Sequence, residues 1–553
     1  MKTKTFIIGV LFVLVAFAAN AQQHNEQVTV EGSYRPQIKR SERMVKMPET
    51  PENKFNIPDY KAETKDFNYG YNMEFETMSA VSYKADYGVE EKNNFLKAGL
   101  GTRLSPLFLF RHYSDLSRTM SIGVGVKHYS SWLNLDDYKK SSFMNNNLNV
   151  MAVNKFKGGQ LRSFVNYKYD MYHLRADVTN DNGRNIHSFN AGAKWLANGS
   201  SYRNLYSELG GDIRSTWIAG ATQENQLNAK AHLAYSDNWI SNKNVDNLQT
   251  AASDFEMNYN NIYQGQVLFA VNPYFTMNGS FYHLHAGIRL DFKEGDAMGV
   301  YPDVMGSVFV LDNMLEFYTK FGGRSKINTF ADIVAENPFV TTNFTQFSEF
   351  GYEKTRLDFQ AGVKSKLANN IDAHLGVRYR NIKNSVFYVP DNDFYATYDD
   401  DATAYHLQAF GLNFMDCNVV NVLADVRWKA MDKLNLAAEL SINGFSLKNS
   451  NVYKRAWYKP SFTMNLRGDY DFNDTWQFNA SVMMMGRRWA LDREGEEQHL
   501  DPAFDIQLGT DYRIKEDLAA FVEVHNLFHQ KYQLYYNYPS LGFEIFAGIK
   551  YRF

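Results

Sequence analysis

Two histidines of this chain stand at a spacing that could support metal chemistry. His283 and His285 are two residues apart, so in an extended segment both side chains lie on one face, where imidazoles can begin a zinc site. The commoner situation for such histidines is a polar wall that faces water inside a barrel. We adopt the second interpretation and predict no metal site here.

The remaining candidates for chemistry are equally weak. Asp391, Asn392, Asp393 and the run 399–401 could offer oxygen ligands to Ca²⁺, but their spacing is not that of a helix-flanked calcium loop, and we predict a solvated acidic loop. Cys417 is the single cysteine, which excludes a disulfide framework and a thiolate cluster. No pattern marks a nucleophile beside its base. We therefore predict that the protein is not an enzyme and needs no cofactor.

The first residues predict export. Lys2 and Lys4 precede an apolar run over 6–19, and Ala19-Asn20-Ala21 is a small-residue cleavage site. The apolar run is too short to span a bilayer comfortably as a helix. We predict that residues 1–21 are a cleaved signal peptide.

Composition narrows the classes that remain. The net charge is −3 with both signs interspersed, which gives no indication of a nucleic-acid partner. After the signal peptide no apolar run approaches 18 residues, so no transmembrane helix is expected. Aromatic residues make up 15% of the chain. These features leave a secreted β-protein, or a membrane barrel whose apolar residues occupy every second position.

The second half of the chain favours the barrel. One segment places Leu357, Phe359, Ala361 and Val363 on one face and Asp358, Gln360 and Lys364 on the other, and similar segments recur to the end of the chain. Such segments run for about 10 residues, which suits a tilted membrane-crossing strand better than a soluble sandwich.

The connections alternate in length, as expected for short periplasmic turns and long outer loops. Short ones are 367–370, 472–474 and 514–517; long polar ones are 177–185, 236–254, 325–353, 389–403 and 492–501. We expect the long ones to be solvated. The prediction is an all-β protein: a transmembrane antiparallel β-barrel over 92–553, with about 22 strands (16–24 fit), after a short extended periplasmic arm over 22–91.

The C-terminus is the sharpest local signal. Phe543, Ile545, Ile549, Tyr551 and Phe553 fall on one apolar face of a closing strand. A final strand that ends in an aromatic residue is typical of bacterial outer-membrane barrels, whose assembly machinery reads that end. We predict an outer-membrane location with membrane lipid and the barrel assembly machinery as partners.

A family resemblance begins just before this strand. Asn526-Leu527-Phe528 with Tyr532, followed by Gly542, Gly548, Tyr551 and Phe553, resembles the end of TonB-dependent receptors. The resemblance implies a 22-stranded barrel, a plug domain inside it, and energised nutrient uptake driven by the TonB complex. The departure is the plug: residues 22–91 are too few for one, and their prolines and charges predict an extended arm.

Within that arm a second motif resembles the same family. Glu26, Gln27, Val28, Thr29 and Val30 resemble a TonB box, the short strand that pairs with the energising partner by β-augmentation. Three functions stay open. The first is nutrient uptake as a TonB-dependent-receptor-like barrel, with a plug or partner supplied in trans. The second is a passive porin-like channel, and the third is a structural, partner-binding subunit of an outer-membrane complex.

Overall fold

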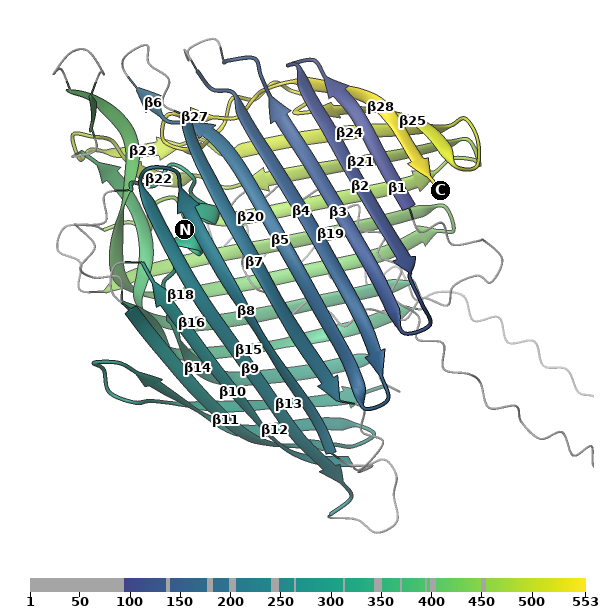
Figure 1. The fold of residues 1–553 in the computed structure, drawn as a ribbon, viewed down its shortest axis with the longest axis vertical. Helices are drawn as coiled ribbons and strands as arrows, with labels where there is room; N and C mark the ends of the chain where they lie inside the picture. The colour runs from purple at the N-terminus through teal and green to yellow at the C-terminus, as the bar shows by residue number, and fades with distance from the viewer. Residues whose placement is uncertain are drawn as a thin grey trace, which may run out of the picture. The chain divides into compact units, whose positions relative to one another are not determined.

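The structure is a computed structural model that describes residues 94–135, 140–176, 183–197, 205–239, 248–262, 265–311, 314–342, 351–368, 370–392, 395–397, 404–448 and 454–553. These residues form a closed barrel of 22 antiparallel strands (Figure 1). Each strand pairs with the next one along the wall, and β28 pairs with β1 to close the ring. The predicted architecture and strand number are confirmed.

The barrel strands are β1 (Asn94–Gly101), β2 (Ser105–Asp115), β3 (Met120–Ser131), β4 (Phe143–Phe156), β5 (Gly159–His173), β7 (Gly183–Ala197), β8 (Leu205–Ile218), β9 (Thr222–Asp237), β10 (Leu248–Asn261), β11 (Gly265–Asn278), β12 (Tyr282–Lys293), β13 (Gly299–Val310), β14 (Leu315–Ile327), β15 (Tyr352–Ala368), β16 (Ile371–Asp391), β18 (Ala404–Met431), β19 (Leu434–Lys448), β20 (Phe462–Asp471), β21 (Trp476–Met485), β24 (Ala503–Arg513), β25 (Leu518–His525) and β28 (Glu544–Arg552).

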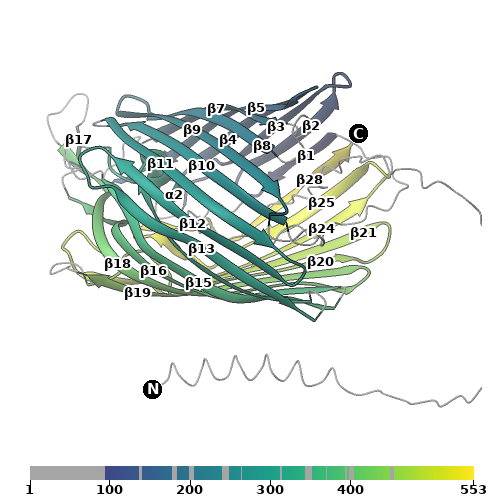
Figure 2. The same cartoon turned by 90° about the horizontal axis from the view of Figure 1, so that it is seen from below.

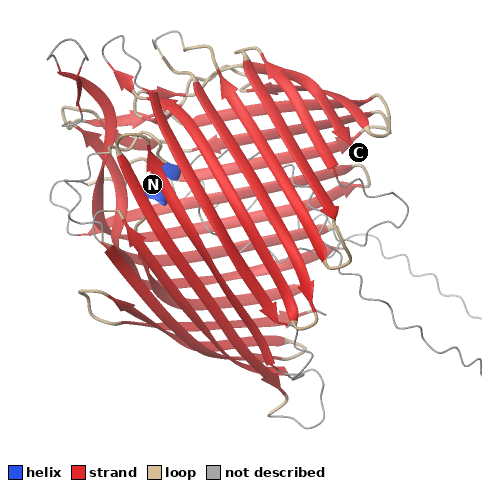
Figure 3. Ribbon diagram, viewed as in Figure 1, coloured by secondary structure: helices blue, strands red, loops and turns tan. Residues whose placement is uncertain are grey.

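Smaller elements sit in the connections. β6 (Arg175–Ala176) and β17 (Tyr395–Thr397) pair with β18, while β22 (Arg488–Leu491) with β23 (Glu497–Leu500), and β26 (Gln533–Tyr535) with β27 (Tyr538–Pro539), form separate hairpins. One short helix, α2 (Phe330–Glu336), stands out among the strands of the described residues (Figure 3). No helix in the described part of the chain is long and apolar enough to cross a membrane.

The two ends of the barrel differ. At one end, here called the terminus end, Asn94 and Phe553 exchange two backbone hydrogen bonds of 3.1 Å, and turns such as Asp432–Lys433 are short. The opposite end, the loop end, carries the connections that hold α2 and the two hairpins, including 328–351. The predicted alternation of short and long connections therefore holds for most of the chain.

The predicted long loop over 236–254 is wrong. Of residues 236–254, β9 extends to Asp237 and β10 begins at Leu248, and the connection that remains lies at the terminus end. The alternation was hard to detect there, because Ala251, Ala252 and Ser253 are all small and give little contrast between the two faces.

The strands have an apolar outer face and a polar inner face. On β12, Leu284, Ile288 and Phe292 are exposed on the outside, whereas His285 and Arg289 lie on the other face, in the lumen. Aromatic rings gather on the outer face near the terminus end, in pairs such as Phe156–Trp195 and Trp476–Tyr512. An apolar band edged by aromatic rings is the surface that a transmembrane barrel presents to lipid.

The ring closes where β1 meets β28. Gly99 lies opposite Gly548 in the register, and a Cβ on Gly548 would stand 2.0 Å from the carbonyl oxygen of Ala98. The two backbones can approach this closely only because neither residue carries a side chain. A small-residue pair therefore marks the seam.

Candidate functional site

The loop end of the barrel contains a segment that folds inward instead of standing in solvent. This segment, residues 328–341 between β14 and β15, is called the cap below. Its helix α2 is capped by Thr329, whose side chain accepts the backbone N–H of Asp332 at 3.1 Å. Phe330, Ala331, Ile333 and Val334 are buried. The prediction that 325–353 is a solvated loop is wrong for the cap, because these apolar side chains need a packed environment.

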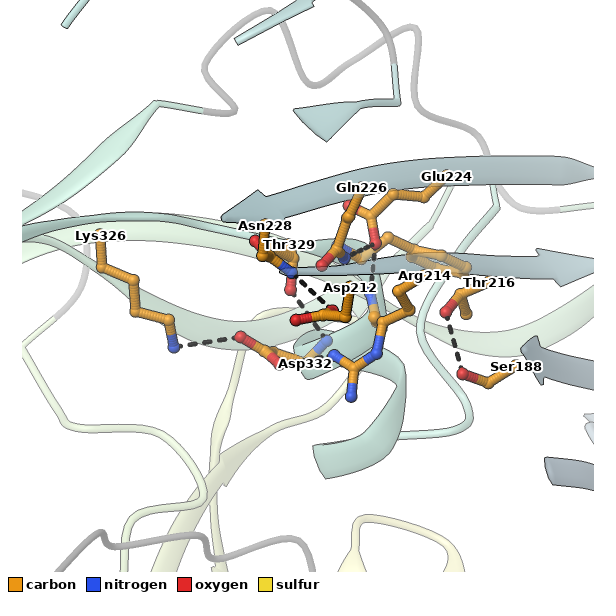
Figure 4. Close-up of polar contacts among 12 residues, drawn as sticks. Ser188, Asp212, Arg214, Thr216, Glu224, Gln226, Asn228, Lys326, Thr329 and Asp332 are labelled. Atoms are coloured by element: carbon orange, nitrogen blue, oxygen red, sulfur yellow. Dashed lines mark hydrogen bonds and ion pairs between the residues drawn. The ribbon is translucent and has the colours of Figure 1, made fainter. Parts of the chain in front are cut away.

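One carboxylate on the wall holds the start of the helix. Glu224 of β9 is 0% exposed, and its two oxygens accept the backbone N–H groups of Phe330 at 2.7 Å and Ala331 at 2.8 Å (Figure 4). These N–H groups have no partner within the helix, and a negative charge at a helix N-terminus is favourable. Gln226 donates a third hydrogen bond to Glu224 at 2.7 Å.

Ion pairs reinforce the same side of the cap. Asp332 of α2 lies 3.2 Å from the Lys326 ammonium and 3.7 Å from the Arg214 guanidinium, as measured between the charged atoms (Figure 4). Lys326 belongs to β14 and Arg214 to β8, so two separate parts of the wall contact one side chain of the helix. These pairs are partly exposed, and we expect each to add little stability compared with Glu224.

The far end of the cap is held by other strands. Arg184 of β7 donates to the carbonyl oxygens of Pro338, at 3.0 Å, and of Val340. Phe410 of β18 exchanges backbone hydrogen bonds with Phe339 and Thr341, at 3.0 and 2.8 Å.

The connection that holds β26 and β27 also contacts the cap. The Tyr535 hydroxyl donates to the carbonyl oxygen of Glu336 at 2.7 Å, and the ring of Tyr538 stacks on Phe339 at 3.7 Å between centroids. The cap is thus bound by β7, β8 and β9, by β18, and by the chain between β25 and β28, which lie in different parts of the ring. A segment with such contacts crosses the mouth of the lumen.

An apolar core surrounds the cap. Its buried members are Ile186, Ile218, Phe330, Ile333, Val334, Val340, Ile382, Phe387, Tyr388, Phe410, Met415, Cys417, Val419, Trp457, Tyr458, Ala490, Leu491 and Leu500. Tyr458 holds a left-handed backbone at φ 61° while its side chain is buried, which is a strained conformation for a residue other than glycine. Cys417 is a buried free thiol of this core.

Below the cap, the inner wall from β12 to β18 carries pairs of a histidine and a carboxylate. His285 Nε2 lies 2.9 Å from Asp303 Oδ2, and His374 Nδ1 lies 2.7 Å from Asp425 Oδ2. The Tyr318 hydroxyl adds a contact of 2.7 Å to His374 Nε2. This part of the wall is called the histidine–carboxylate sector. Its carboxylates lie against imidazoles, which suits a hydrated interior without selection for one sign of ion.

The two histidines singled out by the sequence lie in this sector and face the lumen. They do not converge on one point, because His285 pairs with Asp303 while His283 forms a short hydrogen bond with Asn278. No group of three or more His, Cys, Asp or Glu side chains in the described ranges is arranged to hold a metal ion.

The other residues noted from the sequence have varied outcomes. Asp391 ends β16 and is buried, while 393–394 and 398–403 lie outside the described residues. Ile545, Ile549 and Tyr551 alternate with the inward-facing Phe546 on β28, and Phe543 and Phe553 flank that strand. Their reading by the assembly machinery stays a prediction.

The residues that hold the cap were missed by the sequence argument. A signal was present: Thr329 is followed three residues later by Asp332, and a hydroxyl residue with an acid at that spacing is typical of a helix start. Nothing near Glu224 pointed to its partner, because 106 residues separate it from Phe330.

Comparisons with known proteins place this fold in a class. No protein-family model matches the chain, and no curated protein matches it either. Among solved structures, the ferric-catecholate import receptor Fiu of E. coli K12 has a TM-score of 0.61 at 10% identity, covering 84% of this chain and 82% of that one. The siderophore receptor PirA of Acinetobacter baumannii has a TM-score of 0.62 at 10% identity, covering 83% and 80%.

A third structure, the copper transporter OprC, has a TM-score of 0.58 at 11% identity, covering 83% of this chain and 82% of that one. The chain is thus a transmembrane β-barrel of 22 strands, of the architecture seen in these import receptors. The resemblance to TonB-dependent receptors predicted from the C-terminal residues is confirmed for the fold. The signal peptide, the arm over 22–91 and Glu26–Val30 lie outside the described residues and stay predictions.

Proposed function

We propose that this protein is a barrel of the bacterial outer membrane that takes part in the uptake of a scarce nutrient. The fold it shares with import receptors for ferric siderophores and copper supports this class of function. The apolar outer band with its aromatic edges supports insertion in a bilayer.

The observation that carries the proposal is the cap. A segment fixed to several parts of the wall and embedded in an apolar core crosses the mouth of the lumen. A diffusion channel needs a permanently open path, whereas a receptor needs a path that opens on demand. The cap therefore favours gated uptake over the passive porin.

The proposal includes the source of the energy that drives uptake. The segment Glu26–Val30 is proposed to pair with TonB by adding a strand, and a plug or partner in trans would transmit the pull. The final residues Ile549, Tyr551 and Phe553 are proposed to be read by the barrel assembly machinery during insertion. No catalytic role is assigned to any residue of the lumen.

A growth experiment tests the uptake proposal. Cells that lack their own copy receive the wild-type chain, or a chain in which 26–30 are replaced by five residues of Gly and Ser. We expect the variant to lose growth when a ferric siderophore or copper is limiting, while its amount in the outer membrane equals that of wild type. Equal growth of deletion, variant and wild-type strains on limiting nutrients would contradict the proposal.

A conductance experiment tests the cap. Replacement of Glu224 by alanine removes the acceptor of two buried N–H groups, and we expect the cap to lose about 2 kcal/mol of stability. In planar bilayers we expect almost no ionic current through wild type and frequent stepwise increases in current through Glu224→Ala. Glu208→Ala is the matched control, because Glu208 is an inner-wall carboxylate that pairs with Lys194 and does not contact the cap. A large steady current through wild type would show that the mouth is open.

A further inference from the structure

A row of aromatic rings runs along the inner wall directly beneath the cap. Phe339 of the cap lies 5.9 Å from Tyr172 of β5, which lies 6.5 Å from Phe143 of β4, as measured between ring centroids. Phe143 lies 5.3 Å from Tyr129 of β3, and Tyr129 lies 6.0 Å from Phe546 of β28. Tyr129, Phe143, Tyr172 and Phe339 are only half-buried. The row, called the aromatic arc, thus leaves ring surface open to the lumen.

Amide side chains continue from the arc toward the terminus end. Asn145 donates to the Tyr172 hydroxyl at 2.7 Å and to Asp170 at 2.9 Å. Further down, Asn149 donates to Asn166, which lies opposite Asn190 in the register of β5 and β7. Between them Asn147 is exposed, and its side chain forms no hydrogen bond within the described residues. The amide track consists of Asn145, Asn147, Asn149, Asn166 and Asn190.

The track is open and carries no charge of its own. The inner-face positions of β4 are Phe143, Asn145, Asn147, Asn149, Met151 and Val153, none of them ionisable. Met151 is 45% exposed on the lumen side, although the outer face is where large apolar residues are expected to be exposed. On the flanks, Lys127 of β3 and Lys168 of β5 both lie opposite Asn147 in the register, and Lys168 forms an ion pair with Asp170 at 2.7 Å.

We propose that the aromatic arc and the amide track form a binding path for a neutral, ring-shaped, polyhydroxylated solute, namely an oligosaccharide. This inference rests on the proposed uptake function and names its substrate class. Aromatic faces attract the C–H surfaces of a sugar ring by dispersion, and amides both donate to and accept from hydroxyl groups.

The position of the arc links binding to the cap. Because Phe339 belongs to the cap and stacks at 3.7 Å on Tyr538, a ligand that displaces it from Tyr172 disturbs a contact that holds the cap. Binding at the top of the path and opening of the mouth are therefore coupled through one side chain.

Calorimetric titration of the full chain with maltohexaose tests this proposal, in a detergent that carries no sugar head group. We expect saturable binding to wild type, at least tenfold weaker binding to Asn147→Asp and Tyr172→Ala, and near wild-type binding to Tyr172→Phe, which keeps the ring. Asn465→Asp is the matched control, because Asn465 is an exposed inner-wall amide on β20. Circular dichroism confirms that each variant has kept its strands.

Three other outcomes would overturn the inference. These are the absence of maltohexaose binding to folded wild type, equal losses for Asn147→Asp and Asn465→Asp, and tighter binding of an acidic oligosaccharide of galacturonate. Failure here leaves the growth experiment untouched, since uptake of another solute would still require the chain. Conversely, the chain could bind maltohexaose while the growth experiment shows no need for it on any limiting nutrient. That result would contradict the uptake function and leave the path as a binding site.

Discussion

The histidine–carboxylate sector and the amide track are made from the same kind of strand, yet they stabilise the barrel differently. In the first, buried charges lie beside counter-charges, as Arg289 does beside Asp291 of the same strand and Glu256 of β10, both at 2.8 Å. In the second, neutral amides bond locally and leave groups exposed to the lumen. Breaking a buried ion pair costs several times more than losing a neutral hydrogen bond. The comparison therefore separates a part of the wall that holds the barrel together from a part that is free to bind.

The largest effect is expected where the charged sector is most buried. Asp291 is 0% exposed and also accepts the backbone N–H of Ser325 at 2.5 Å. Asp291→Ala leaves Arg289 with one fewer partner and Ser325 with none from this side chain, and we expect a loss of about 3 kcal/mol in the free energy of unfolding. Denaturant unfolding in lipid vesicles measures it. A loss below 1 kcal/mol would remove the distinction between the two regions.

A smaller effect is expected on the amide track. Asn149→Ala removes one neutral hydrogen bond to Asn166 at a half-buried site, which we expect to cost about 1 kcal/mol or less. The same unfolding assay applies, with Leu148→Ala on the outer face of the same strand as the comparison. If Asn149→Ala destabilised the barrel as strongly as Asp291→Ala, the track would be a structural network.

The smallest effect concerns pH. Asp296 lies in the connection between β12 and β13, and hydrogen bonds from the ammonium groups of Lys354 and Lys293 lower its pKa to about 2. A lowered folded-state pKa means that the stabilisation is complete above the ordinary aspartate value and is lost as the pH falls toward 2. Asp296→Asn should therefore lower the unfolding temperature slightly at pH 7 and not at pH 2. A difference that persists at pH 2 would assign the effect to packing.

The strands of the barrel wall could be predicted from the sequence, whereas the cap at its mouth could not, and the reason is physical. A strand between lipid and water needs apolar and polar residues in turn, so segments such as 357–364 reveal both faces by themselves. The closing strand from Phe543 to Phe553 could be predicted from the same alternation. Where small residues filled both faces, as at Ala251 and Ala252, the same reasoning placed a loop where strands run.

The candidate site depends on contacts that no local pattern encodes. Glu224 meets Phe330 only because β9 and the cap are brought together by the closed ring, and the same holds for Tyr535 and Glu336. The aromatic arc likewise takes one ring from each of several strands. Alternation along one strand can show which side chains share a face, but only the register of the strands shows which of them meet.

The left-handed backbone of Tyr458 has a consequence for how the cap responds to a ligand. A buried non-glycine residue in this conformation stores about 1–3 kcal/mol. If release of the cap lets Tyr458 relax, that energy is recovered on opening, and the equilibrium constant for opening is raised about 5- to 160-fold above what the bonds alone would allow. A weakly bound solute would then be enough to shift the equilibrium from the closed to the open form of the cap.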